Sequence, residues 1–163
     1  MQTFPHHYKV TAAAGASDDV ALSGDRLPRL CSAPPAEFDG PGDRWSPETL
    51  LLGAVADCFV LTFRAAAKFS KLPWLSIACD ADGIVDRAAG VTAFTAFSLR
   101  VLLRVPEGTN EEQATRLLTR AKQNCLISNS LKAGCDLQLE VQTEGTENLE
   151  LRTQKDFELT QSF

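Results

Sequence analysis

The sequence lacks a cluster of basic residues, and its longest apolar stretch is short. Its formal net charge is −5, so it lacks the positive surface with which proteins bind phosphate backbones, and we expect no nucleic-acid partner. The first ten residues contain no basic segment followed by an apolar run, so no secretory signal is predicted. The apolar stretch 50–63 contains Asp57 and is too short to span a bilayer. We therefore expect a cytoplasmic protein without a membrane partner.

The cysteines form neither a CxxC pair nor a cluster with zinc-ligand spacing, so no metal site and no cofactor are expected. The five are Cys31, Cys58, Cys79, Cys125 and Cys135. The two histidines, His6 and His7, are adjacent near the N-terminus and are interpreted as surface residues. An odd number of cysteines in a reducing compartment argues against a disulfide framework. Any disulfide here is expected to be transient and functional.

The length of 163 residues and the 44% hydrophobic content suit one globular domain, which we place at residues 1–144, followed by a polar tail, 145–163. Segments 8–13 and 20–23 read as short strands of a small meander. Residues 34–45 hold three prolines and two glycines, which predicts a loop.

The best-signalled element is a helix that begins at Pro47. Ser46 supplies a capping hydroxyl, Pro47 suits the first helical position, and Glu48 places a carboxylate against the helix dipole. The helix is predicted to run to about Phe69. Its residues are apolar on nearly every side, so we expect it to be covered all round.

We expect an α+β fold, in which extended segments pair as antiparallel strands and helices lie between them. Two antiparallel strands, a helix capped by Asn110 and a final strand are expected at 75–86, 92–105, 110–124 and 136–142. Cys125 lies just past the helix, and a short turn or helix is expected at 128–132. Cys79 and Cys135 are interpreted as strand residues packed in or near the sheet.

Cys58 and Cys125 are the candidates for chemistry, although each alone has a purely structural interpretation. Cys58 lies within an apolar helix, where a free cysteine commonly serves as a small buried hydrophobe. Cys125 lies at a helix end beside polar residues and is equally readable as a packed loop thiol.

Three segments in order, WSPETLL, VADCF and QNCLISNSLKA, resemble the OsmC/Ohr family, and the similarity covers residues 8–142. Family members have a Pro-Glu pair at the start of the central helix, a reactive cysteine ten residues on, and a second cysteine later. On this chain these positions are Glu48, Cys58 and Cys125. The resemblance implies antiparallel sheets around central buried helices in an intertwined homodimer.

The activity implied by the resemblance is thiol-dependent reduction of organic hydroperoxides. The thiolate of Cys58 would attack the peroxide, and Cys125 would convert the resulting sulfenic acid to a Cys58–Cys125 disulfide. A dithiol or small-thiol reductant would restore both thiols. A non-enzymatic protein of the same fold is the alternative, with a hydrophobic ligand at the dimer interface and redox-sensitive cysteines.

The chain departs from the family at the arginine that activates the reactive thiol. OsmC-like members place it directly before the loop phenylalanine, but here Glu37 precedes Phe38. Arg26, Arg29 and Arg44 are the upstream substitutes, each also readable as a solvated surface residue. Arg44 ranks first because it is nearest to the helix start.

Glu48 is the candidate residue that would hold this arginine. Ten helical residues separate it from Cys58, roughly 15 Å at about 1.5 Å per residue, so it would have to serve the Cys58 of another chain. The structural alternative is that Glu48 only stabilises the helix through its dipole.

Overall fold

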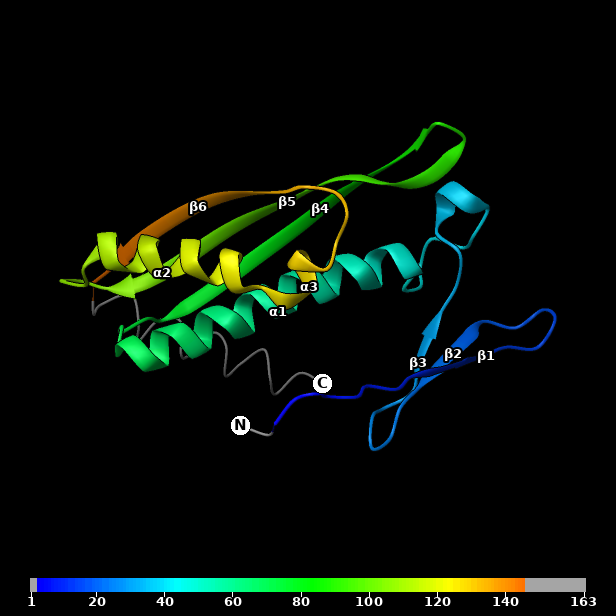
Figure 1. The fold of residues 1–163 in the computed structure, drawn as a ribbon, viewed down its shortest axis with the longest axis horizontal. Helices are drawn as coiled ribbons and strands as arrows, with labels where there is room; N and C mark the ends of the chain where they lie inside the picture. Colours follow the sequence, from blue (N-terminus) through cyan, green and yellow to red (C-terminus); the bar gives the residue numbers. More distant parts are fainter. Residues whose placement is uncertain (1–2, 146–163) are drawn as a thin grey trace. The chain divides into compact units, whose positions relative to one another are not determined.

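A computed structural model of the chain describes residues 3–145 (Figure 1). The chain divides into two compact units after Leu51. The single domain expected over residues 1–144 stays a prediction. The tail expected from residue 145 lies, apart from Gly145 itself, outside the described residues.

The first unit contains a three-stranded antiparallel sheet of order β1-β2-β3. The strands are β1 (Thr11–Ala13), β2 (Val20–Ser23) and β3 (Leu30–Ser32). The meander expected from the first two segments is confirmed, and β3 is a third strand that the sequence did not reveal. The expected loop at 34–45 contains one short 3₁₀ helix, η1 (Ala36–Phe38).

Helix α1 (Pro47–Ser70) begins where the sequence predicted. The Thr49 backbone N–H donates to Ser46 Oγ at 3.2 Å, and the Ser46 N–H donates to Thr49 Oγ1 at 2.8 Å. These reciprocal bonds satisfy donors that a helix start otherwise leaves unpaired. The helix ends at Ser70, and the next residue, Lys71, adopts a left-handed φ of 53° shortly before Pro73.

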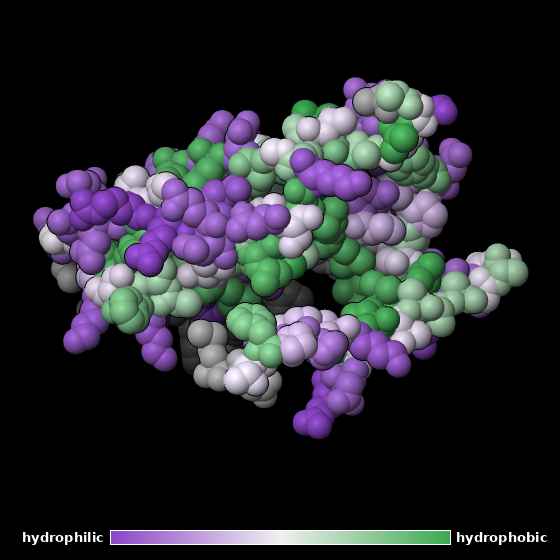
Figure 2. Space-filling view, viewed as in Figure 1, coloured by the Kyte–Doolittle hydropathy of each residue, from purple (hydrophilic) through white to green (hydrophobic). Residues whose placement is uncertain are grey.

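Within the described chain, α1 buries a single stripe. The stripe consists of Val55, Phe59, Phe63 and Ala67, which follow one another at four-residue intervals. Leu61 and Phe69 are 49% and 90% exposed, and apolar surface lies beside the hydrophilic face of the neighbouring helix (Figure 2). The expected all-round cover therefore stays a prediction about an assembly.

The helix is also longer than the apolar stretch considered in the sequence. At 24 residues it is apolar enough, by length and composition alone, to cross a bilayer. The core helix of a soluble protein passes the same test. The four-residue stripe that it buries is the pattern of a helix packed on one side against a core.

The second unit contains the main sheet, whose long hairpin is formed by β4 (Ser76–Ala88) and β5 (Val91–Pro106). The antiparallel pairing is confirmed. Its register shifts between Ile84 and Val85, which face Ala96 and Phe94 respectively, so β5 contains one extra residue there. This bulge explains the imperfect alternation of the sequence and lets the rings of Phe94 and Phe97 stack at 4.9 Å.

A helical crossover joins β5 to the last strand. Helix α2 (Glu111–Asn124) starts at Asn110, whose Oδ1 accepts from the Gln113 N–H at 2.9 Å, as the sequence predicted. The short helix α3 (Leu126–Asn129) begins two residues before the turn or helix expected at 128–132. Strand β6 (Cys135–Glu144) pairs with β5 in parallel, so the sheet order is β4-β5-β6. A parallel neighbour requires such a crossover.

The core of the second unit lies between the sheet and the helices, which occupy one face of it (Figure 1). Alternate residues of β5 point to this face and are buried: Phe97, Leu99, Val101, Leu103 and Val105. Phe63 of α1 meets Trp74 edge-on, with ring centroids 5.7 Å apart. The α+β class expected from the sequence is confirmed.

Candidate active site

The structure brings Cys58 and Cys125 together. Cys58 lies on α1, half-buried against the core, and Cys125 occupies the junction between α2 and α3 with no exposed surface. The two thiols are within hydrogen-bond reach of each other, and Cys125 Sγ also donates to the carbonyl oxygen of Val55 at 4.0 Å. Residues 67 positions apart in the sequence thus form one thiol pair.

Backbone bonds on both sides hold Cys125 in place. Its N–H donates to the Lys122 carbonyl at 3.3 Å, which closes α2. Its own carbonyl accepts from the Asn129 N–H at 3.0 Å and from Ser128 Oγ at 3.2 Å, which opens α3. The sulfur is therefore fixed by two helix ends rather than by a flexible loop.

The surroundings of Cys58 raise the pKa of its thiol. Burial is the largest cause, and the hydrogen bond and charge of Cys125 act in the same direction. A hydrogen bond from the Ile127 backbone N–H favours the thiolate and partly offsets this rise. The Thr62 hydroxyl donates to the backbone carbonyl of Cys58 at 2.7 Å. Within the described residues, none of the groups that shift this pKa is a cation. The surroundings of Cys58 in the described chain therefore disfavour the thiolate.

Two further thiols lie close to Cys125, and the sequence treated them only as packed strand residues. Cys79 is paired in register with Val101, and Cys135 with Phe97, so both point to the buried face of the sheet. The charge of Cys125 acts on the pKa of both. The alternation of inward and outward residues along β4 and β6 was the sequence feature that could have placed both thiols on the buried face. Among the described residues, no three His, Cys, Asp or Glu side chains are arranged to hold a metal ion.

Because of Cys79, the free energy of unfolding is expected to fall at alkaline pH. Burial, with the charge of Asp80, raises the pKa of its thiol from 9.0 to about 11. The unfolded thiol ionises first, so the stabilising contribution of the neutral form is complete below pH 9 and is lost as pH rises towards about 11. Urea unfolding gives the difference in unfolding free energy between the wild type and Cys79→Ala, at about pH 8 and at about pH 10.5. We expect a smaller difference at the higher pH. An equal difference between the two proteins at both pH values would contradict this.

Glu48 carries a buried oxygen that is open to a further partner. In the residues that the structure describes, its Oε2 is buried and accepts no hydrogen bond. A buried carboxylate oxygen without a donor is costly, so a cation or N–H from elsewhere would stabilise it.

Arg44, the first-ranked candidate cation, pairs with two other carboxylates. Its Nε lies 3.1 Å from Asp19 Oδ2 and its NH1 2.8 Å from Asp43 Oδ2, and these partners raise the pKa of its guanidinium. Arg26 pairs with Asp25 at 3.5 Å and is highly exposed. A role of Arg44 at the thiol stays a prediction.

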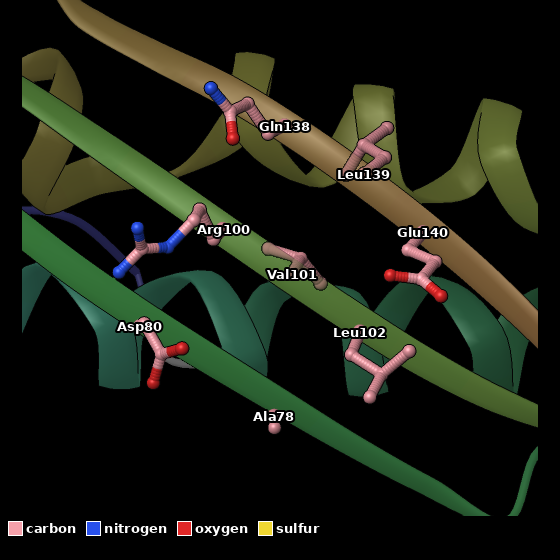
Figure 3. Close-up of a pocket in the computed structure, with 8 residues that line it drawn as sticks. All are labelled: Ala78, Asp80, Arg100, Val101, Leu102, Gln138, Leu139 and Glu140. Atoms are coloured by element: carbon pink, nitrogen blue, oxygen red, sulfur yellow. The ribbon is translucent and has the colours of Figure 1, made fainter.

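An open groove on the other face of the sheet is remote from this chemistry. Arg100, Asp80, Gln138 and Glu140 line it, together with Ala78, Val101, Leu102 and Leu139 (Figure 3). The side chains of Arg100 and Leu102 alternate with those that face the helices, so the groove lies on the side away from the thiols. It is not part of the candidate site.

The chain is therefore an α+β protein with a two-thiol site. One thiol lies on the core helix α1 and the other on the helical crossover between β5 and β6. The chain belongs to the OsmC-like protein family, whose model matches residues 40–140. That range contains all four predicted site residues: Arg44, Glu48, Cys58 and Cys125.

One curated relative and several solved structures are similar over most of the chain. The uncharacterized protein YmaD of Bacillus subtilis (strain 168) is 29% identical over 141 residues, which cover 83% of this chain and 93% of that protein. An OsmC-like protein from Mycoplasma pneumoniae has a TM-score of 0.73 at 14% identity, over 85% of this chain and 99% of its own. The organic hydroperoxide resistance protein OsmC from Legionella pneumophila has a TM-score of 0.66 at 24% identity, over 85% and 99%.

A fourth similar protein was solved with a small molecule in its active site. It is a candidate organic hydroperoxide resistance protein from Vibrio cholerae O1 biovar eltor str. N16961, with captopril bound in one of its active sites. It is 26% identical, with a TM-score of 0.64 over 86% of this chain and 95% of that one.

Proposed function

We propose that the protein is a cytoplasmic thiol peroxidase that reduces organic hydroperoxides. The observation that carries this proposal is the contact between the Cys58 and Cys125 thiols, since two sulfurs already within hydrogen-bond reach need little movement to form a disulfide. The organic hydroperoxide resistance proteins among the similar structures support the choice of substrate.

In the proposed cycle, the Cys58 thiolate attacks the distal oxygen of the hydroperoxide and the O–O bond breaks. The alkoxide leaves and takes up a proton as the alcohol, while Cys58 becomes a sulfenic acid. Cys125 then attacks the Cys58 sulfur, water leaves, and a Cys58–Cys125 disulfide forms. A dithiol or small-thiol reductant supplies two electrons and two protons and restores both thiols.

The assignment of Cys58 as the attacking residue rests on access and hydrogen bonding. Cys58 is half-buried, whereas Cys125 has no exposed surface, so a peroxide reaches Cys58 first. The Ile127 backbone N–H at Cys58 is a donor for a thiolate. Cys125 lies deeper in the core, next to Cys58, which suits a thiol that resolves the sulfenic acid.

We infer that a homodimer completes the site. Three observations support this: the raised pKa of Cys58, the buried unpartnered Oε2 of Glu48, and the single covered stripe of α1. Burial of the remaining apolar residues of α1 against a second copy would remove exposed surface such as that of Leu61 and Phe69. An arginine held by Glu48 of that copy would supply the missing cation.

The dimer is expected in solution at micromolar concentration, and Glu48→Gln is expected to slow oxidation of Cys58 by about 10²-fold because the cation loses its anchor. X-ray scattering measures the mass and stopped-flow mixing the rate. Glu37→Gln, which removes the same charge from an exposed site, is the matched control. A monomer, or equal rates in the two variants, would contradict the inference.

One observation favours a second function, that of a non-enzymatic protein that binds a hydrophobic ligand. Within the described residues no cation offsets the desolvation of Cys58, and an unionised thiol reacts slowly with peroxide. In that case the apolar surface of the dimer interface would take the ligand, and the cysteines would act as a slow redox switch.

Stopped-flow oxidation of the reduced protein separates the two functions. The peroxidase is expected to react faster with cumene hydroperoxide than with hydrogen peroxide, because the apolar surroundings of Cys58 favour an apolar alkyl group. The rate should rise with pH as the thiolate forms, since burial raises the pKa of Cys58. Slow oxidation by both peroxides would favour the binding protein.

A further inference from the structure

Cys125 has neighbouring thiols on two sides. On one side lies Cys58, and on the other Cys79 and Cys135, whose charges interact with that of Cys125. All four sulfurs belong to the same core or pack directly against it. A two-cysteine cycle uses only Cys58 and Cys125 and leaves the other two thiols of this core without a role.

We propose that Cys135 is a third redox-active thiol, which displaces Cys58 from the Cys58–Cys125 disulfide and forms a Cys125–Cys135 disulfide. This inference rests on the proposed function, because it begins from the Cys58–Cys125 disulfide. It adds that the external reductant reacts with Cys135.

The position of Cys135 suits this role. It is the first residue of β6 and its side chain points to the buried face, opposite Phe97 of β5. It is only partly buried, whereas Cys125 has no exposed surface, so a reductant reaches Cys135 more easily. The segment 129–134, which joins α3 to β6, contains no fully buried residue, although Leu131 packs against the core. Such a segment opens more easily than a buried one.

The local charges favour Cys135 over Cys79. Burial raises the pKa of the Cys135 thiol, but the Lys122 ammonium acts in the opposite direction and favours the thiolate. No cation lowers the pKa of the Cys79 thiol, and the charge of Asp80 raises that pKa further than burial alone. Cys79 also lies within the hairpin strand β4, where residues before and after it pair with β5, whereas Cys135 is the first residue of β6. Cys79 therefore serves as the matched control.

The step is a thiol–disulfide exchange and needs no oxidant. The Cys135 thiolate attacks Cys125 Sγ, a Cys125–Cys135 bond forms, the Cys58–Cys125 bond breaks, and Cys58 leaves as a thiolate. The proton given up by Cys135 returns to the leaving sulfur or to water. An external dithiol then attacks the Cys135 sulfur and reduces the second disulfide. Meanwhile Cys58 is already free for another peroxide.

The experiment maps disulfides over time in the full-length reduced protein. One sample receives one equivalent of cumene hydroperoxide, and a parallel sample receives one equivalent of diamide, which forms disulfides without peroxide. Aliquots are acid-quenched, alkylated with N-ethylmaleimide and digested with trypsin. Cleavage at Arg64, Arg87, Lys122 and Lys132 places Cys58, Cys79, Cys125 and Cys135 on separate peptides.

We expect the Cys58–Cys125 cross-link first and the Cys125–Cys135 cross-link after it, with free Cys58 regained in step. In Cys135→Ser the second cross-link is lost and the first persists, while Cys79→Ser behaves as the wild type. If Cys135 stays fully alkylatable at every time in both samples, the inference is overturned. Both disulfides with diamide but none with hydroperoxide would support the exchange and refute the peroxidase.

Discussion

Cys58→Ser is expected to abolish hydroperoxide reduction, with a fall in rate on the order of 10³-fold or more. A serine hydroxyl stays protonated at neutral pH and does not attack peroxide oxygen, so the residual rate should be that of unactivated thiols. Consumption of cumene hydroperoxide in the presence of a dithiol measures the effect.

Cys79→Ser is the control for this result. It removes a thiol from the same core, but one whose pKa is raised to about 11 and which therefore stays protonated. Its rate should equal that of the wild type. Comparable losses in the two variants would show that the chemistry does not belong to Cys58.

Phe63→Ala is expected to lower the free energy of unfolding by about 3–5 kcal/mol. The side chain has no exposed surface, lies in the stripe that α1 presents to the core and packs edge-on against Trp74. Its removal leaves a cavity that the sheet is too closely packed to fill. Urea unfolding followed by circular dichroism measures the change.

Phe4→Ala offers a matched control outside this helix. Phe4 is 83% exposed, and its truncation should change the unfolding free energy by no more than about 0.5 kcal/mol. Equal destabilisation by the two substitutions would contradict the packing described for α1.

Local signals allowed much of the fold to be predicted from the sequence. Ser46 and Asn110 cap helices through bonds to residues three positions away, so their effect is visible in a short window. The three residues of β3 are too few to show alternation, and that strand was missed. The parallel pairing of β6 was also missed, because alternation is the same in parallel and antiparallel strands.

The candidate site was predictable only in part. The pairing of Cys58 with Cys125 came from the resemblance to a family, since no local pattern brings these two positions together. The approach of Cys79 and Cys135 to Cys125 depends on strand register across β5, which the sequence does not specify. Within the described residues no cation acts on Cys58, and Glu48 keeps a buried oxygen without a hydrogen-bond partner.

The central claim is that Cys58 and Cys125 form one redox pair. The most direct test is rapid mixing of the reduced protein with one equivalent of cumene hydroperoxide, acid quenching within milliseconds, and peptide mass spectrometry of the first disulfide. We expect that disulfide to join Cys58 to Cys125, with Cys31 and Cys79 still free. A first disulfide between any other pair, or oxidation spread evenly over the five cysteines, would contradict the account.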